Sequence, residues 1–285
     1  MLQCINMRFP GGLGKAVTLS CDDGRVEDAR LLFLMRDYGI RGTFNLNPGM
    51  FRTEENAAEL QGRMSREECL ALYGDYPEME IACHGSTHPF LVNLPLSAAT
   101  AETVENRKLL EEMFGRIVRG MAYPYGSNTE AVRNIMRMCG IAYGRTIHKT
   151  LSFSLPDDWL KWDPTCSFCS ADTIDAGERF AQYQPERAPA LFAIWGHSSD
   201  MTCFTGGWVK LEACFRHIGR REDTWYATNI EVCDYAAAFE RLQYSADGGR
   251  VFNPNGLSIW CSYKHRWYDE TRILEIPPMT CRELV

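Results

Sequence analysis

The chain has 285 residues, of which 45% are hydrophobic and 24% charged, an ordinary composition for a globular protein. Its formal net charge of -7 and the lack of a basic stripe argue against nucleic acid or an anionic membrane as the main partner. No run approaches the roughly 18 apolar residues of a membrane-spanning helix, and the first residues lack the features of a signal peptide. We therefore expect a cytoplasmic protein, long enough for one large α/β barrel.

The twelve cysteines are scattered along the chain, and several lie in apolar segments, as buried free thiols do. We expect a reduced protein without a disulfide framework. Cys166 and Cys169, in the sequence CSFC, have the spacing of a metal or redox pair. No second pair completes a zinc site.

Apolar β-prone runs alternate with helical patterns over most of the chain, which is typical of a repeating βα fold. The predicted strands are Ala16–Cys21, Thr43–Leu46, Glu80–Cys83, Val118–Tyr123, Ala142–Arg145, Leu191–Trp195 and Trp225–Thr228. The predicted helices are 26–39, 65–74, 96–115, 129–140, 208–219 and 231–244. The stretch from Ile147 to Asp172 fits neither pattern, and loops of that length are often functional.

These elements predict an α/β fold, a distorted (β/α)7 barrel of TIM-like type that occupies residues 1–244. After Tyr244 the pattern changes, because SADGGRVFNPNG is rich in turn residues. LSIWCSY and TRILEIPP are predicted as two strands without a following helix. We expect residues 245–285 to form a small β appendage that covers an end or an edge of the barrel.

Polar residues follow several predicted strands at the points where the strands end. Asp22 and Asp23 follow the first strand, His84 and His88 the third, and His197 the sixth. Taken singly, an Asp pair is more often a helix cap, and a histidine after a strand is more often a satisfied polar side chain. The carboxyl ends of the strands form one face of a barrel, however, and that face carries the active site. The shared placement therefore favours a catalytic site.

Four motifs resemble those of the polysaccharide deacetylases of the NodB-homology type, carbohydrate esterase family 4. They are TLSCDD at Thr18–Asp23, HGSTH at His84–His88, AYPYG at Ala122–Gly126 and IWGH at Ile194–His197. The first is similar to T-F-D-D, with Ser-Cys where Thr-Phe would stand, and the second to H-x-x-x-H. A further motif of the family has only PDDWLKWDP as its counterpart. The resemblance covers roughly residues 15–244.

The resemblance implies that Asp23, His84 and His88 bind one divalent metal ion, while Asp22 stays unliganded as the general base. Two imidazoles and one carboxylate suit zinc, and cobalt, nickel or iron also fit. The backbone N–H of Tyr125 would stabilise the oxyanion of an attacked carbonyl. In the same resemblance, His197 would protonate the leaving amine.

One departure from the family pattern is Ala122, which stands where an arginine pairs with the catalytic aspartate in most of the family. Arg145, at the end of the fifth predicted strand, lies one strand along on the same face. We expect its guanidinium to lie within salt-bridge distance of Asp22, and the alternative is that Arg145 is a surface residue on a loop. Tyr125, Trp195 and Trp208 are candidates for stacking on a sugar, although Trp195 also fits the core.

The implied activity is that of a metal-dependent hydrolase acting on carbon–nitrogen bonds other than peptide bonds. N-deacetylation of an amino-sugar-containing saccharide is the leading hypothesis, with a small-molecule or oligosaccharide substrate. One alternative is an allantoinase-like hydrolase of a small cyclic amide. Another is a catalytically impaired carbohydrate-binding protein, which Ala122 favours. The oligomeric state is left open.

Overall fold

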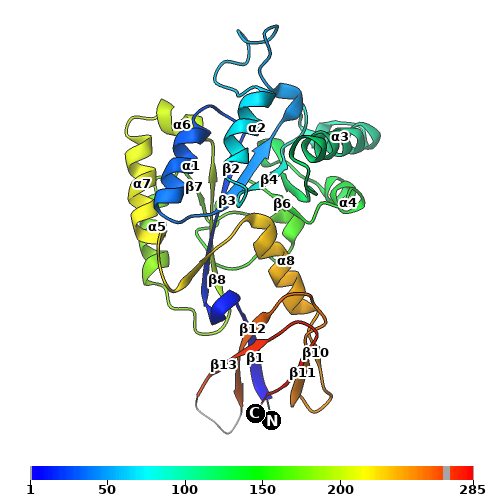
Figure 1. Ribbon diagram of the computed structural model, residues 1–285, viewed down its shortest axis with the longest axis vertical. Helices are drawn as coiled ribbons and strands as arrows, with labels where there is room; N and C mark the ends of the chain where they lie inside the picture. The colour runs from blue at the N-terminus through cyan, green and yellow to red at the C-terminus, as the bar shows by residue number, and fades with distance from the viewer. Residues whose placement is uncertain (1, 266–269, 285) are drawn as a thin grey trace.

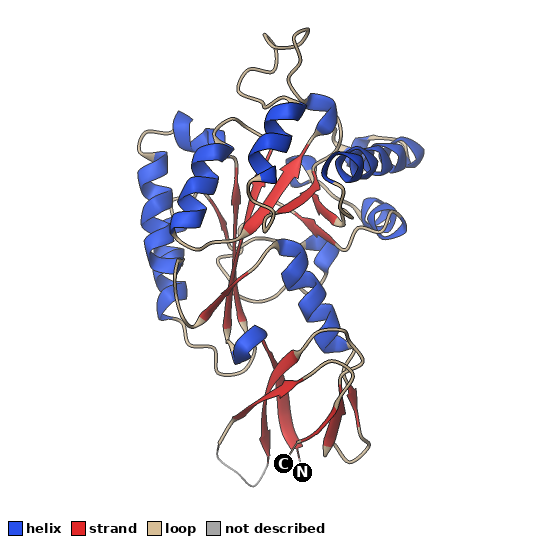
Figure 2. Ribbon diagram, in the orientation of Figure 1, coloured by secondary structure: helices blue, strands red, loops and turns tan. Residues whose placement is uncertain are grey.

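The main body of the protein is a parallel sheet with helices packed around it (Figures 1 and 2), in a computed structural model that describes residues 2–265 and 270–284. The strands hydrogen bond in the order β6-β5-β4-β3-β2-β8-β7, and β9 pairs with β2. They are β2 (Lys15–Asp22), β3 (Gly42–Leu46), β4 (Glu80–Cys83), β5 (Gly120–Ala122), β6 (Tyr143–Arg145), β7 (Cys166–Ser167), β8 (Ala190–Gly196) and β9 (Thr224–Tyr226). The predicted α/β fold with a distorted barrel is confirmed.

The central strand is β2, and all eight of its residues are buried. It pairs with β8 along most of its length and with β3 from Leu19 onward, while β9 pairs with its first three residues. An apolar strand that is covered on both faces is typical of parallel sheets. The strand ends at Asp22, so its last residue emerges at the carboxyl face of the barrel.

A segment that the sequence left unassigned links the two ends of this sheet. Trp162 forms a parallel bridge with Arg145 of β6. A few residues later, Cys166 and Ser167 pair with Ile194 and Trp195 of β8 as strand β7. The stretch 147–172 therefore contains the connection that draws β6 toward β8, rather than a free loop.

Helices follow most of the strands, as the sequence predicts, and two more are present. The helices are α1 (Asp28–Asp37), α2 (Arg66–Gly74), α3 (Leu96–Phe114), α4 (Glu130–Met138), α5 (Thr173–Gln182), α6 (Ser198–Cys203), α7 (Gly207–Ile218) and α8 (Asn229–Glu240). Helices α5 and α6 were not predicted from the sequence. Within the described residues no helix is long and apolar enough to cross a membrane, and all twelve cysteines are free.

The tail forms two small antiparallel sheets, and both chain ends lie there (Figure 1). The first sheet has the order β1-β12-β13 and the second the order β10-β11-β14. Their strands are β1 (Leu2–Arg8), β10 (Gln243–Tyr244), β11 (Arg250–Phe252), β12 (Ile259–His265), β13 (Arg272–Ile276) and β14 (Cys281–Glu283). The two predicted tail strands correspond to β12 and β13. Strand β1, which comes from the other end of the chain, was not predicted from the sequence.

The tail packs on the end of the barrel where the strands begin. Ala16 and Leu191, near the starts of β2 and β8, share one apolar cluster with Val251 and Ile259 of the tail. The hydroxyl of Tyr235 in α8 donates to the carbonyl of Arg8 and accepts from the N–H of Trp260, each at 2.8 Å. The carboxyl ends of the strands, where the predicted site lies, therefore face away from the tail.

Candidate metal centre and active site

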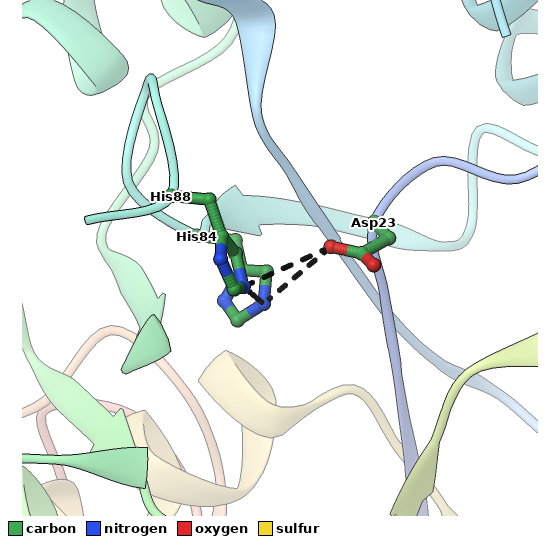
Figure 3. A group of neighbouring side chains, drawn as sticks. All are labelled: Asp23, His84 and His88. Carbon is green, nitrogen blue, oxygen red and sulfur yellow. Dashed lines mark hydrogen bonds and ion pairs between the residues drawn. The ribbon is translucent and has the colours of Figure 1, made fainter. Parts of the chain in front are cut away.

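Asp23, His84 and His88 come together at the carboxyl face of the barrel (Figure 3). The Nε2 atoms of the two histidines lie 3.2 Å apart. Oδ1 of Asp23 lies 3.8 Å from Nε2 of His84 and 4.0 Å from Nε2 of His88. Two imidazole nitrogens and one carboxylate oxygen at this spacing fit a single divalent ion with open positions.

The histidines are held in the form that a metal requires. Nδ1 of His84 donates to the carbonyl of Ala122 at 2.7 Å, so that in the neutral imidazole Nε2 carries the lone pair and is directed at the other two side chains. Burial and the neighbouring His84 lower the pKa of His88 to about 4. His88 is thus neutral at pH 7, which is the state in which imidazole binds metals.

Asp23 is fixed by an arginine that the sequence analysis missed. Its φ of 86° turns the chain sharply after β2. Arg63 donates to the Asp23 carbonyl at 2.9 Å and forms an ion pair with Oδ1 at 3.1 Å. That buried Oδ1 accepts no hydrogen bond, so the atom nearest both histidines has capacity for a cation. Arg63 lies between η2 (Pro48–Met50) and α2, in a segment with no recognisable motif.

Asp22 and Arg145 form a buried ion pair beside the three ligand candidates, and each is 2% exposed. Nη2 of Arg145 lies 2.6 Å from Oδ2 of Asp22, so the contact predicted from Ala122 is present. Asn45 donates to the other oxygen at 2.8 Å. Burial alone would raise the pKa of Asp22, but the adjacent Arg145 guanidinium outweighs it and lowers the pKa. Asp22 is therefore ionised.

The ring of Trp195 supports this ion pair. Cζ of Arg145 lies 4.5 Å from the centre of that ring, and the His197 ring is 5.9 Å away. A guanidinium over an indole gains from the negative face of the ring. Trp195 thus contacts both Arg145 and His197. Its ring helps to position these two side chains and is more than a core residue.

His197 follows β8 and pairs with an aspartate that the sequence analysis did not identify. Nδ1 of His197 lies 3.0 Å from Oδ2 of Asp200, three residues along the same turn. Burial would lower the pKa of His197, but the bond to Asp200 and the charges of Asp22 and Asp23 raise it to about 8. The imidazole is thus protonated at neutral pH, with Nε2 free to donate. The sequence HSSD carries this spacing, so Asp200 could have been found.

Tyr125 lies at the edge of the site in a left-handed conformation, with φ 59°. Its ring stacks on Phe90 with the ring centres 3.7 Å apart, and it meets the His88 ring at 4.6 Å. Trp208, another aromatic candidate from the sequence, is 8% exposed and lies under Arg30. It is therefore part of the packing between α1 and α7 and offers no open face.

Residues 11–144 match the family model described as polysaccharide deacetylase. No curated protein matches the chain. Among solved structures, a Mycobacterium smegmatis protein assigned to the polysaccharide deacetylases has a TM-score of 0.55 at 15% identity, over 84% of this chain and 96% of that one.

A family 4 carbohydrate esterase from Streptomyces lividans in complex with acetate has a TM-score of 0.47 at 15% identity, over 72% of this chain and 88% of that one. The Streptococcus pyogenes deacetylase PplD in complex with acetate has a TM-score of 0.40 at 16% identity, over 46% of this chain. The chain spans 55% of the length of that last protein.

The fold and the site define an α/β barrel with a candidate metal centre at the carboxyl ends of its strands. The family match covers the segment that supplies all three ligand candidates. Residues 11–144 are therefore similar to a polysaccharide deacetylase domain.

Proposed function

We propose that this protein is a metal-dependent hydrolase that removes the N-acetyl group from an amino-sugar-containing saccharide. The observation that carries the proposal is the convergence of three groups on one face. They are the Asp23, His84 and His88 cluster, the buried Asp22–Arg145 pair and the Asp200–His197 pair. A set of ligands, an ionised acceptor and a protonated donor is what hydrolysis of an amide requires.

A divalent ion held by Asp23, His84 and His88 would polarise the amide carbonyl and acidify water. Zinc suits these ligands best, and cobalt, nickel or iron are alternatives. Asp22 is ionised and held by Arg145, so it accepts the proton of the attacking water. The N–H of Tyr125 donates to the oxyanion, a contribution of about 3 kcal/mol for one donor.

His197 completes the reaction by donating a proton to the leaving nitrogen, because an amine is too basic to depart as an anion. Its Nδ1 is engaged by Asp200, so Nε2 delivers the proton. The Asp200 carboxylate keeps the imidazole charged and fixes its orientation, as second partners of catalytic histidines do. In this proposal Arg145 replaces the arginine that is absent at Ala122, which weakens the case for an impaired binding protein.

The experiment is metal analysis of the purified protein, followed by acetate release from N-acetylated sugars and ring opening of cyclic ureides. We expect about one equivalent of divalent metal and release of acetate from sugars. His84→Ala with His88→Ala should remove the metal, whereas Asp22→Asn should retain it and lose turnover. Full metal content in the double histidine variant contradicts the ligand assignment. Turnover of cyclic ureides alone favours the allantoinase-like alternative.

A further inference from the structure

Several large apolar side chains are exposed on the segments that follow the strands. The exposed ones among the described residues are Val26 after β2, Phe90 after β4, Tyr125 after β5, Ile147 after β6 and Phe204 beyond β8. Exposed apolar side chains gathered on one face mark a binding surface more often than scattered ones do. The acetyl methyl group alone is too small to account for this arrangement.

Three of these side chains, Phe90, Tyr125 and Ile147, lie at the same turn and are called the Phe90 patch. The rings of Phe90 and Tyr125 are nearly parallel, with an interplanar angle of 6°. Ile147 packs on the same turn, since a Cβ added to Gly126 would meet its Cγ1 at 2.5 Å. The patch touches the metal cluster directly, because the Tyr125 ring contacts His88.

Within the patch, Phe90 offers the open face. The Tyr125 ring meets two other rings, because it stacks on Phe90 and also contacts His88. Phe90 is 44% exposed although one of its faces lies on Tyr125. Its exposed area therefore lies on the outer face and the edge of the ring. Of the other aromatic candidates, Trp195 supports Arg145 and Trp208 is covered.

We propose that the outer face of Phe90 is the platform on which the pyranose ring of the substrate stacks, so that Phe90 determines specificity for ring-bearing acetamides. The inference rests on the proposed function and names the group beside the scissile bond. An acetamide on a pyranose carbon holds the sugar ring next to the attacked carbonyl. The ring must then lie against a wall adjacent to the metal ligands, and the Phe90 patch is such a wall.

A flat aromatic face fits the apolar C–H face of a pyranose, with its hydroxyl groups left at the edge in water. A long N-acyl chain is the other apolar group that such a surface could bind. It would need an enclosed channel to be desolvated on all sides. Phe90 and Tyr125 are instead half exposed, which suits a ring that is bound on one face.

The test compares Phe90→Ala, Phe90→Trp and Phe33→Ala in the full-length, metal-loaded protein. Phe33 is a matched control, because it is an exposed phenylalanine on α1 outside the patch. The substrates are an N-acetylglucosamine disaccharide, its N-butyryl analogue and the acyclic N-acetylethanolamine. Binding of the disaccharide is also measured by calorimetry in the Asp22→Asn background, which needs no turnover.

We expect Phe90→Ala to raise KM and Kd for the disaccharide about tenfold, with kcat and metal content unchanged. N-acetylethanolamine should be unaffected, and Phe90→Trp should restore binding. A fall in kcat with unchanged KM would overturn the proposal and make Phe90 a support for Tyr125. A selective loss of the N-butyryl substrate would assign the patch to the acyl group instead. If no variant or wild-type protein releases acetate while Phe90→Ala still loses disaccharide binding, the proposed reaction fails and the platform stands.

Discussion

At the scale of single residues, the buried ion pair of Asp22 and Arg145 is the contact whose loss should affect activity most. A buried charge that loses its partner is left uncompensated, which costs about 3–5 kcal/mol. Arg145→Ala should therefore raise the pKa of Asp22 and reduce the ionised fraction. We predict a fall in kcat of about 10–100-fold, as for other second partners of a catalytic group, with metal content unchanged. Arg216→Ala, on the exposed face of α7, is the control.

Steady-state kinetics combined with metal analysis separates the possible results for Arg145→Ala. A normal kcat would mean that Asp22 does not need its arginine. A loss of metal together with activity would mean that Arg145 supports coordination rather than proton transfer. The two outcomes are read from the same protein samples.

His197 and Asp200 make a prediction about pH. Because the His197 pKa is about 8, the protonated form is lost as pH rises through this value, and a general acid loses activity with it. The value of kcat/KM should therefore fall above pH of about 8. Asp200→Asn removes the negative charge that raises the pKa, so the fall should begin at lower pH. A pH–rate profile that is identical in Asp200→Asn contradicts the role of His197 as the acid.

The functional residues could be predicted where they belong to short sequence motifs. The strand ends place Asp23, His84 and His88 on one face, and the resemblance to the deacetylase motifs selects them as ligands. Arg145 follows from the same resemblance, because alanine stands at position 122. Arg63 could not be predicted, because it reaches Asp23 from a loop 40 residues away. Phe90 was missed for another reason, since a phenylalanine after HP is equally compatible with a buried position.

At the scale of elements, strands with continuous apolar runs were predictable and short ones were not. β2 is eight buried residues and is evident from the sequence. β7 has two residues and is defined by its neighbours, so no periodicity exists to find it. α5 follows the unassigned stretch 147–172, and α6 lies between the predicted strand 191–195 and the predicted helix 208–219, so neither was predicted. β9 was expected as a seventh barrel strand, but it shares an edge of β2 with β3.

The start of α1 is tied to two other elements by a buried carboxylate. Asp28 accepts hydrogen bonds from Ser198 at the start of α6 and from Tyr73 in α2. Burial raises its pKa to about 6 against these hydrogen bonds. The folded protein therefore binds more protons than the unfolded chain between pH of about 4 and 6.

The contribution of Asp28 to the free energy of unfolding is fully present below the pKa that Asp28 has in the unfolded chain. It is lost as the pH rises through its pKa of about 6 in the folded protein. We predict that the unfolding free energy of the wild type falls relative to Asp28→Asn by up to about 3 kcal/mol over this range. Denaturant unfolding at a series of pH values, with a chelator present, measures the difference. Parallel curves for the two proteins would show that Asp28 titrates normally.

At the scale of the whole molecule, the sequence predicted two parts but not how they are joined. The change of pattern after Tyr244 marks the tail, yet β1 pairs with β12 from the opposite end of the chain. Pairing between residues more than 250 positions apart leaves no local pattern. The division at residue 244 remains a prediction, and Leu2–Arg8 contributes a strand to the tail.

The position of the tail leads to the last prediction. It packs where the barrel strands begin, while the ligand candidates follow the carboxyl ends. Removing residues 245–285 would leave β1 without its partner and expose the cluster around Tyr235. The truncated protein should be less stable or less soluble, with KM for a small N-acetylated substrate little changed in the folded fraction.

Tyr235→Phe is the milder form of the same test, because it removes only the hydroxyl that links Arg8 to Trp260. Two hydrogen bonds at about 1 kcal/mol each predict a loss of about 2 kcal/mol in unfolding free energy. Thermal denaturation and KM are measured together. A stable truncated protein that turns over normally but binds substrate far more weakly would make the tail part of the substrate site. Because the apolar cluster between tail and barrel lies at the end of the barrel opposite the ligand candidates, we expect the tail to stabilise the fold and not to bind substrate.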